Sequence, residues 1–485
     1  MDKTIAAKRK QRFLISCLLI LLLFALIMLF LFALPAMRRK QEKKAALLQI
    51  QEGASTHNAF FLSMYPIGGF SEEAFHTYEG LDLMKLSFTI PDYDMFLLCL
   101  EELQRSCPNP QKLYLGLDPL LLTKEQVSSI PAMFPNTDLS ILLAPRSLEE
   151  WCGIKEIDAS LAAYRSITDA LTSQPRVKVY PFFAQEWVIA NPENYINSME
   201  LREDISLRLF LYGLFEEETR DCRIRPEETE ELFVQLRQLI SDTASGTYAF
   251  PDLSSWKIVF IGDSVIGNFI DRRSIPAYLH DLAGATTYNC GWGGATAASV
   301  GTQSLEILLN GLIEGATESL PEESQAYIGL SEVRSRESQE SLDDPHTLFV
   351  LHFGINDYYK GLPLDAADPL DTGSCSGAMR NGIERLRAAY PHARLLMILP
   401  NHVFLFGEGT EPMGEEGHVY EDYINALTEI AKAYQLPVLD DYHQIINSEK
   451  SYVHVDDGTH PNDYGRFQIA YALMRLIADQ MEETY

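Results

Sequence analysis

Two short segments of the sequence carry the residue types that acyl transfer requires. Ser264 stands in the sequence GDS directly after an apolar run, and His460 follows Asp457 by three residues. A serine hydroxyl attacks a carbonyl carbon when a base removes its proton, and a histidine can take that proton and return it to the leaving group. The histidine needs an acid that orients its ring and stabilises its positive charge. Ser264, Asp457 and His460 are therefore the candidate catalytic residues, and Asp456 is a weaker candidate for the acid.

Two further segments can supply hydrogen-bond donors for a negatively charged intermediate. They are NCGWGGAT at residues 289–296 and FGIND at residues 353–357. The backbone amides of Ser264 and Gly294 and the side-chain amide of Asn356 are donors of the right kind, and one such donor contributes about 3 kcal/mol to the stability of an oxyanion. Ser264, Gly294 and Asn356 are therefore the predicted oxyanion hole.

Other polar and aromatic residues near these segments have simpler interpretations. We interpret three histidines as strand-end or loop residues without a catalytic role: His352, His402 and His454. Three aromatic residues flank the candidate site and either contact a substrate or pack structurally: Trp292, Tyr358 and Tyr359.

The candidate residues follow short apolar runs, which are typical of buried strands. The runs lie at Lys257–Ile261, Thr286–Asn289, Leu348–Phe353, Arg394–Leu399 and Pro437–Leu439, with longer mixed segments between them. This alternation predicts a parallel sheet with helices on both faces. The carboxyl ends of parallel strands share one edge, so distant loops can meet in one crevice there. The last segment has an apolar stripe that predicts a helix: Phe467, Ala470, Met474, Ile477 and Met481.

Four segments of the second half resemble the conserved blocks of the SGNH/GDSL hydrolase family, in the family's order and spacing. They are IVFIGDSVIGNF, NCGWGGAT, FGIND and DDGTHPN, and the resemblance covers about residues 256–485. It implies a flavodoxin-like α/β/α sandwich and a serine esterase or acyltransferase without a cofactor or a metal. By position, the family's nucleophile falls on Ser264, its acid and base on Asp457 and His460, and its oxyanion donors on Gly294 and Asn356.

The first half of the chain has a similar succession of apolar runs. They lie at Phe60–Met64, Met84–Thr89, Leu113–Leu117, Leu139–Leu143 and Val177–Phe182, and a helix is predicted at about Glu203 to Phe215. The sequence YPIGGF at 65–70 ends like SVIGNF at 264–269 and places Tyr65 where Ser264 stands. Residues 193–206 hold the place of the DxxH loop but contain no histidine. We predict an α/β domain, either an inactive copy of the second fold or an unrelated domain for spacing or binding.

Composition divides the chain into four parts. Residues 1–44 are a basic head with an apolar segment, and 56–240 form the first α/β domain, ending in a helix at Leu232–Ile240. Residues 241–255 have linker composition, and 256–485 form the hydrolase domain.

An uncharged run of 25 residues from Phe13 to Met37 predicts a transmembrane helix, because about 20 apolar residues cross a bilayer. A cleaved signal peptide and a buried core helix are the alternatives, and the run is long for a signal peptide. Basic residues flank both ends, so charge does not decide the orientation. A short basic head before a large folded part favours a single-pass cell-membrane anchor with the bulk of the chain extracytoplasmic.

The net charge of −29 lies in the body of the chain, because residues 1–44 contain ten basic and only two acidic residues. Such an acidic body repels phosphate backbones, so nucleic acid is not an expected partner. The six cysteines outside the apolar run are irregularly spaced and show no zinc pattern. We interpret them as buried free thiols, and disulfides formed outside the cell are the alternative.

These observations predict a membrane-anchored, extracytoplasmic serine esterase or acyltransferase of a bacterium. The expected substrates are O-acyl groups, acetyl or D-alanyl, of a cell-envelope polymer, or a small ester. The alternative is a non-catalytic envelope assembly or glycan-binding protein built on two folds of this kind.

Overall fold

The computed structural model describes residues 39–64, 83–87, 93–191, 194–195, 201–202, 224–267, 273–405, 407–448, 451, 455 and 457–481. The chain divides into two compact units, Met1–Tyr248 and Ala249–Tyr485. Several predictions fall outside the described residues: the membrane helix at 13–37, Tyr65, most of residues 193–206, and the whole of the helix at about Glu203 to Phe215. Within the described ranges, no helix is both long enough and apolar enough to cross a membrane.

The first unit is built on a sheet of five parallel strands in the order β2-β1-β3-β4-β5. The strands are β1 (Ala59–Ser63), β2 (Leu83–Ser87), β3 (Lys112–Leu117), β4 (Asp138–Leu143) and β5 (Val177–Tyr180). Each lies within two residues of its predicted range. Every residue of β1 is buried, as expected for a strand covered on both faces.

The second unit contains a sheet of five parallel strands in the order β10-β9-β8-β6-β7. The strands are β6 (Lys257–Gly262), β7 (Thr286–Asn289), β8 (Thr347–His352), β9 (Arg394–Leu399) and β10 (Val438–Asp440). Numbered from the first strand of each unit, both sheets have the order 2-1-3-4-5, which is the flavodoxin-like arrangement. The predicted parallel α/β fold is confirmed, and the first unit has the strand order that an inactive copy requires.

Helices of the first unit include α3 (Tyr93–Ser106), α4 (Lys124–Met133), α5 (Leu148–Gly153), α6 (Ile157–Thr172), α7 (Glu186–Ile189) and α9 (Thr229–Ser245). The helix predicted at Leu232–Ile240 is longer at both ends, so the predicted linker start at residue 241 is wrong. Glu230 and Glu231 lie in its first turn, where negative charge stabilises a helix. Gly246, with φ +75°, ends it.

A helix at residues 39–54 precedes the first strand. Ala46, Ile50 and Gly53 are buried at intervals of four and three residues, so one face of this helix packs against its own unit. Gln51 also donates a hydrogen bond to Glu102 of α3 at 2.8 Å. The folded part of the first unit therefore begins well before residue 56, the predicted boundary.

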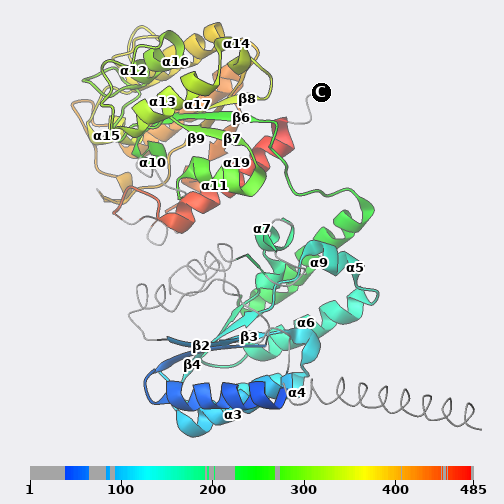
Figure 1. The fold of residues 1–485 in the computed structure, drawn as a ribbon. Coiled ribbons are helices and arrows are strands. Elements are labelled where there is room, and N and C mark those ends of the chain that lie inside the picture. The colour runs from blue at the N-terminus through cyan, green and yellow to red at the C-terminus, as the bar shows by residue number, and fades with distance from the viewer. Residues whose placement is uncertain are drawn as a thin grey trace, which may run out of the picture. The chain divides into compact units, whose positions relative to one another are not determined.

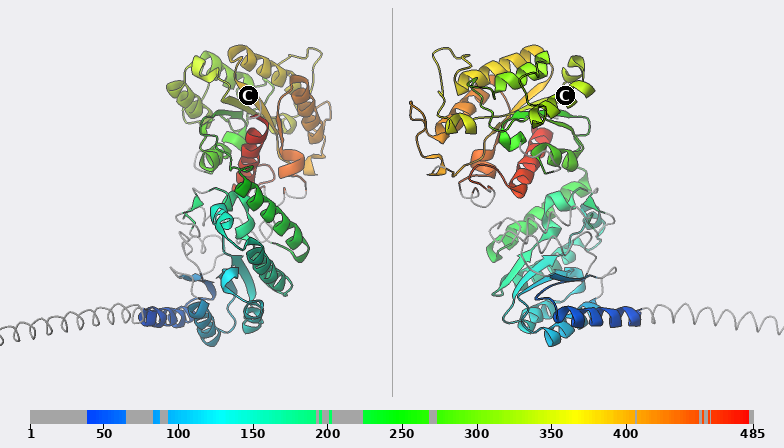
Figure 2. Two further views of the ribbon diagram at one scale, coloured as in Figure 1. Left: turned by 90° about the vertical axis from the view of Figure 1, so that its right-hand side faces the viewer. Right: turned by 60° about the vertical axis from the view of Figure 1, so that its left-hand side comes forward.

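Helices of the second unit include α10 (Ser264–Gly267), α11 (Ile275–Ala283), α12 (Leu305–Leu309), α13 (Gln325–Arg336), α14 (Gln339–Leu342), α15 (Ile355–Tyr359), α16 (Cys375–Ala389), α17 (Tyr420–Tyr434) and α19 (Asp463–Met481). Helices α11 and α19 lie on one side of the sheet, and α12 and α16 lie on the other (Figure 1). The C-terminal helix α19, red in Figure 2, packs against α11. Its predicted stripe is confirmed at Phe467, Ala470, Met474 and Ile477, all buried.

Candidate active site

The structure brings Ser264, His460 and Asp457 together at the carboxyl edge of the second sheet. Ser264 begins α10, two residues after β6 ends, and is almost fully buried. Its Oγ lies 2.8 Å from His460 Nε2, and His460 Nδ1 lies 2.7 Å from Asp457 Oδ2. This continuous hydrogen-bonded series is the arrangement in which a histidine can accept the serine proton while a carboxylate holds its ring.

The loop that carries Asp457 and His460 is held by its own backbone. Asp457 Oδ1 accepts hydrogen bonds from the amides of Thr459 at 3.0 Å and His460 at 2.8 Å. Burial opposes the ionisation of Asp457, but the bonds from the His460 amide and ring outweigh it and lower the pKa of the carboxyl. Asp457 is thus a carboxylate at neutral pH. The weaker candidate, Asp456, lies outside the described residues.

Two of the predicted oxyanion donors, Gly294 and Asn356, lie in adjoining segments after β7 and β8. Gly294 has φ +78°, a backbone conformation that favours glycine. The Asn356 side-chain amide donates to the carbonyl of Ala295 at 3.0 Å, and its second N–H is not used by this bond. Asn356 therefore adjoins the segment that carries Gly294.

Backbone contact joins the segment after β6 to the segment after β7. A Cβ atom placed on Gly267 would lie 2.4 Å from the carbonyl carbon of Gly291, so neither residue has room for a side chain. Asn289 Nδ2 donates to the carbonyl of Ile266 at 2.9 Å, and the Trp292 amide donates to Gly262 at 2.9 Å. The helix that begins at Ser264 is therefore fixed against the oxyanion segment.

Behind Ser264 lies a buried pair of ionisable residues. Asp263 Oδ1 lies 3.2 Å from His352 Nδ1 and also accepts the amide of Val265 at 3.0 Å. Burial alone would lower the pKa of His352, but the neighbouring Asp263 carboxylate outweighs it and raises that pKa. Asp263 therefore ties the first turn of α10 to the end of β8. Sequence reasoning missed this pair, because nothing in the sequence near His352 points to Asp263.

The remaining flanking residues have separate positions. His402 Nδ1 lies 3.1 Å from Ser451 Oγ in the interior, and His454 lies outside the described residues. Tyr358 is buried and donates to the carbonyl of Glu411, whereas the Tyr359 hydroxyl lies 2.8 Å from Thr459 Oγ1. Tyr359 thus contacts the loop that carries His460, and Trp292 is buried like Tyr358.

Metal-ligating side chains do not gather in the part of the chain that the structure describes. No group of three or more His, Cys, Asp or Glu residues there could hold an ion. The cysteines among the described residues are free thiols: Cys99, Cys107, Cys152, Cys290 and Cys375. Of these, Cys107 and Cys152 are half-buried and the other three are buried.

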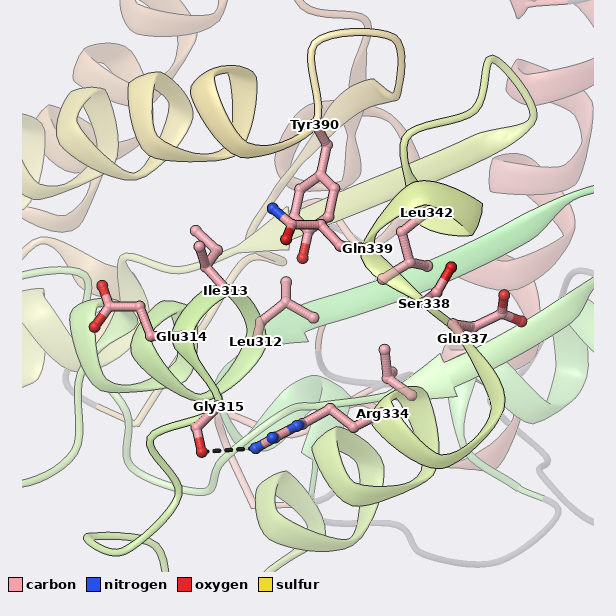
Figure 3. Close-up of a pocket in the computed structure, with 11 residues that line it drawn as sticks. Leu312, Ile313, Glu314, Gly315, Arg334, Glu337, Ser338, Gln339, Leu342 and Tyr390 are labelled. Atoms are coloured by element: carbon pink, nitrogen blue, oxygen red, sulfur yellow. Dashed lines mark hydrogen bonds between the residues drawn. The ribbon is translucent and has the colours of Figure 1, made fainter.

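A separate cavity of about 190 Å³ lies in the second unit (Figure 3). It is lined by residues of the short π-helix at Asn310–Glu314, by residues of α13 and α14, and by Tyr390. Arg334 donates to the carbonyl of Gly315 at 2.6 Å on its wall. Leu342 and Tyr390 shortly precede β8 and β9, so this cavity lies at the amino ends of the strands. The triad lies at the opposite ends.

Comparison with known proteins places the hydrolase motifs in one family. The model of the GDSL-like Lipase/Acylhydrolase family matches residues 260–466. Among proteins of curated function, none matches the chain.

Several solved structures are similar to slightly less than half of the chain. One is a protein from Lactobacillus plantarum, 19% identical, with a TM-score of 0.34 over 46% of this chain and 97% of that chain. A possible lipase from Chitinophaga pinensis is 19% identical, with a TM-score of 0.31 and the same coverage. A carbohydrate acetylesterase family member from Sinorhizobium meliloti is 16% identical, with a TM-score of 0.29 over 46% of this chain and 97% of that chain.

The family match spans the strands and loops that hold Ser264, Gly294, Asn356, Asp457 and His460. Residues 260–466 thus match the GDSL-like lipase/acylhydrolase family, and this match supports a serine hydrolase of the esterase or acyltransferase class.

Proposed function

We propose that Ser264 is the nucleophile, His460 the general base and acid, and Asp457 the residue that orients His460. The observation that carries this proposal is the pair of short contacts, 2.8 Å from Ser264 Oγ to His460 Nε2 and 2.7 Å from His460 Nδ1 to Asp457 Oδ2. A serine that only capped α10 would not need a histidine at hydrogen-bond distance.

The reaction proceeds in two halves. Ser264 Oγ attacks the acyl carbonyl carbon while its proton moves to His460 Nε2, giving a tetrahedral oxyanion. The oxyanion collapses, the bond to the leaving alkoxide breaks, and His460 returns the proton to that oxygen. Water or an alcohol then gives its proton to His460 and attacks the acyl-serine. Collapse of the second oxyanion releases an acid or a new ester and restores the Ser264 hydroxyl.

The backbone amides of Ser264 and Gly294 and the Asn356 side chain donate to the oxyanion in both halves. These donors are fixed before the substrate arrives: Gly294 by its positive φ, and Asn356 by its bond to Ala295. Donors that need no rearrangement stabilise the transition state more than the bound ester.

We place this chemistry outside the cytoplasm, on a single-pass membrane anchor formed by residues 13–37. Support for the anchor is the uncharged length of that run. The proposed substrates are O-acetyl or O-D-alanyl groups of a bacterial cell-envelope polymer, which a membrane-held enzyme of this class meets on that side.

A serine-reactive fluorophosphonate tests the nucleophile. The full-length protein in detergent should be labelled once, at Ser264, as read by peptide mass spectrometry. Ser264→Ala should not be labelled. A folded wild-type protein without label would contradict an active serine and favour a non-catalytic binding role.

Product release from envelope material tests the substrate class. Wild-type protein and Ser264→Ala should be incubated with acetylated and with D-alanylated wall polymer, and free acetate and D-alanine measured. Release or transfer of one acyl group by the wild type alone is expected. Digestion of the folded part by protease added to intact cells tests the extracytoplasmic placement, and protection would contradict it.

A further inference from the structure

Helix α15 carries a second polar residue directly after Asn356. Asp357 is fully buried, and each of its carboxylate oxygens accepts a backbone amide of the oxyanion segment. Oδ2 accepts the amide of Ala297 and Oδ1 that of Ala298, both at 2.9 Å. One carboxylate thus holds two successive residues that lie three and four positions beyond Gly294.

The segment that Asp357 holds has little regular structure. Residues 290–304 contain turns and one isolated bridge, between Thr296 and Ser304, but no helix or paired strand. Its backbone position therefore depends on contacts from elsewhere, and α15 and the residue that caps it, Lys360, supply several of them. Besides Asp357, Asn356 donates to Ala295, and Lys360 Nζ donates to the carbonyl of Gly294 at 2.7 Å.

The buried carboxylate is well suited to hold backbone amides. Burial raises the pKa of Asp357 to about 6, while the amides of Ala298 and Ala297 oppose that rise. The ionised form therefore predominates at neutral pH, and hydrogen bonds to an ionised acceptor are roughly twice as strong as bonds between neutral groups. An asparagine in this place would present an N–H to one of the two amides and could accept only one of them.

We propose that Asp357 is a positioning residue of the oxyanion hole, whose carboxylate holds the 294–298 segment so that the Gly294 amide and the Asn356 side chain act on the same oxyanion. Asp357 itself does not touch the substrate. It fixes the distance between the segment after β7 and the segment after β8, each of which contributes one donor.

This role has a kinetic signature that a purely structural role lacks. The proposed donors act on the tetrahedral oxyanion and only weakly on the planar ester, so their displacement lowers kcat and leaves KM nearly unchanged. Loss of one oxyanion donor lowers kcat by about 10²- to 10³-fold. Displacement of a segment that carries one donor should therefore lower kcat by about 10²-fold.

The test compares Asp357→Asn with the wild type in full-length protein, using p-nitrophenyl acetate as substrate. We expect kcat to fall by about 10²-fold, with KM within about threefold of the wild type. The affinity for a boronic acid that forms a tetrahedral adduct with a serine should fall by a similar factor. A matched control is Asp343→Asn, because Asp343 accepts the His392 amide at 2.6 Å near the amino ends of the strands. This control should keep the wild-type kcat.

The inference depends on the serine chemistry proposed above, and the outcomes separate the two. A wild type without esterase activity would refute the serine mechanism itself. An active wild type, with a folded Asp357→Asn that retains kcat within about threefold, would overturn the positioning role alone. An equal change in Asp343→Asn would also overturn it, because the effect would then follow from general destabilisation.

A second variant, Lys360→Met, tests the positioning of the same segment if Asp357→Asn does not fold. Lys360 is exposed, so Lys360→Met should leave the melting temperature unchanged while it removes the bond to the Gly294 carbonyl. The expected result is a fall in kcat of about three- to tenfold, the size of one solvent-exposed hydrogen bond, with KM unchanged. A wild-type kcat in Lys360→Met would then overturn the view that α15 positions this segment.

Discussion

The two units share one strand order but use the carboxyl edge of the sheet differently. In the second unit, Ser264 and His460 meet at this edge, with Asp457 58% exposed beside them. In the first unit, Asp118 follows β3 and Arg146 follows β4, and their side chains form a buried ion pair at 2.7 Å. Only 2% of the Asp118 side chain and 7% of the Arg146 side chain are exposed.

The difference shows how little of the chemistry follows from the strand order. Around Arg146, Tyr164 accepts a hydrogen bond at 2.9 Å and Glu150 forms a second ion pair. The charges of Arg146 and Asp118 therefore have their partners within the protein and little contact with water. The same edge of a 2-1-3-4-5 sheet can thus hold a reactive triad or a closed set of ion pairs. The side chains after the strands decide which.

The largest expected effect is the loss of activity when the serine of the second unit, but not that of the first, is replaced by alanine. Ser264→Ala should lower the turnover of p-nitrophenyl acetate by roughly 10⁵-fold or more, because the site has no substitute nucleophile. Ser63, buried at the end of β1, the first strand of the first unit, provides the matched control. Ser63→Ala should keep the wild-type rate. Turnover that survives Ser264→Ala in pure protein would remove the second unit's serine from the mechanism.

The next effect ranks the two partners of Ser264. His460→Ala should cost about as much as Ser264→Ala, because the histidine moves the proton. Asp457→Asn should cost less, by a factor of roughly 10 to 100, because the carboxylate orients and stabilises the ring. The kcat values of purified variants decide this order. A larger loss in Asp457→Asn than in His460→Ala would contradict the assignment of roles.

A third experiment tests the buried ion pair between Arg146 and Asp118 at the carboxyl edge of the first sheet. Arg146→Met leaves the buried Asp118 without its partner and should lower the free energy of unfolding by about 3–5 kcal/mol. Below the melting transition, p-nitrophenyl acetate turnover should stay at the wild-type value, because no proposed catalytic residue lies in that unit. The control is Arg165→Met in α6, whose ion pair with Glu230 is about half exposed, with an expected cost of about 0–1 kcal/mol. Calorimetry and initial rates measure both quantities.

The smallest effect concerns pH. The rate should fall by up to about tenfold per pH unit on the acid side, because a general base accepts the serine proton only in its unprotonated form. The Asp457 carboxyl adds no further change in rate near neutral pH. Its lowered pKa keeps it ionised until the pH is below the usual range for the pKa of an aspartate. A profile of kcat/KM that is flat between about pH 5 and 8 would exclude histidine as the base.

Sequence patterns predicted the sheets well because their strands are short, apolar and buried. Thr286–Asn289 and Arg394–Leu399 have the predicted bounds. Strand β6 ends one residue later than predicted, and β8 and β10 are each shifted by one residue from their predicted ranges. Helix ends were predicted less well. The helix α9 begins at Thr229 and ends at Ser245, because its acidic first turn and its polar last turn look like connecting segments in the sequence.

Residues that take part in the chemistry could be predicted from their type and spacing, whereas Asp357, which acts by holding backbone amides, could not. Ser264, Asp457 and His460 are recognisable by type and spacing, and the structure places them in contact. Asp357 binds the amides of Ala297 and Ala298 across about sixty residues of sequence. Almost any residue type can donate its backbone amide. The residue types at positions 297 and 298 therefore do not indicate this contact with Asp357.

The close backbone contact between Gly267 and Gly291 indicates how a mutation outside the triad can abolish the activity. A single nucleotide change turns a glycine codon into an alanine codon, and the added methyl group would lie within 3 Å of backbone at either residue. The helix that begins at Ser264 and the segment that holds Gly294 would then have to separate. A related protein can thus retain Ser264 and His460 and still be inactive. Both glycine positions should therefore be checked before activity is inferred for any relative.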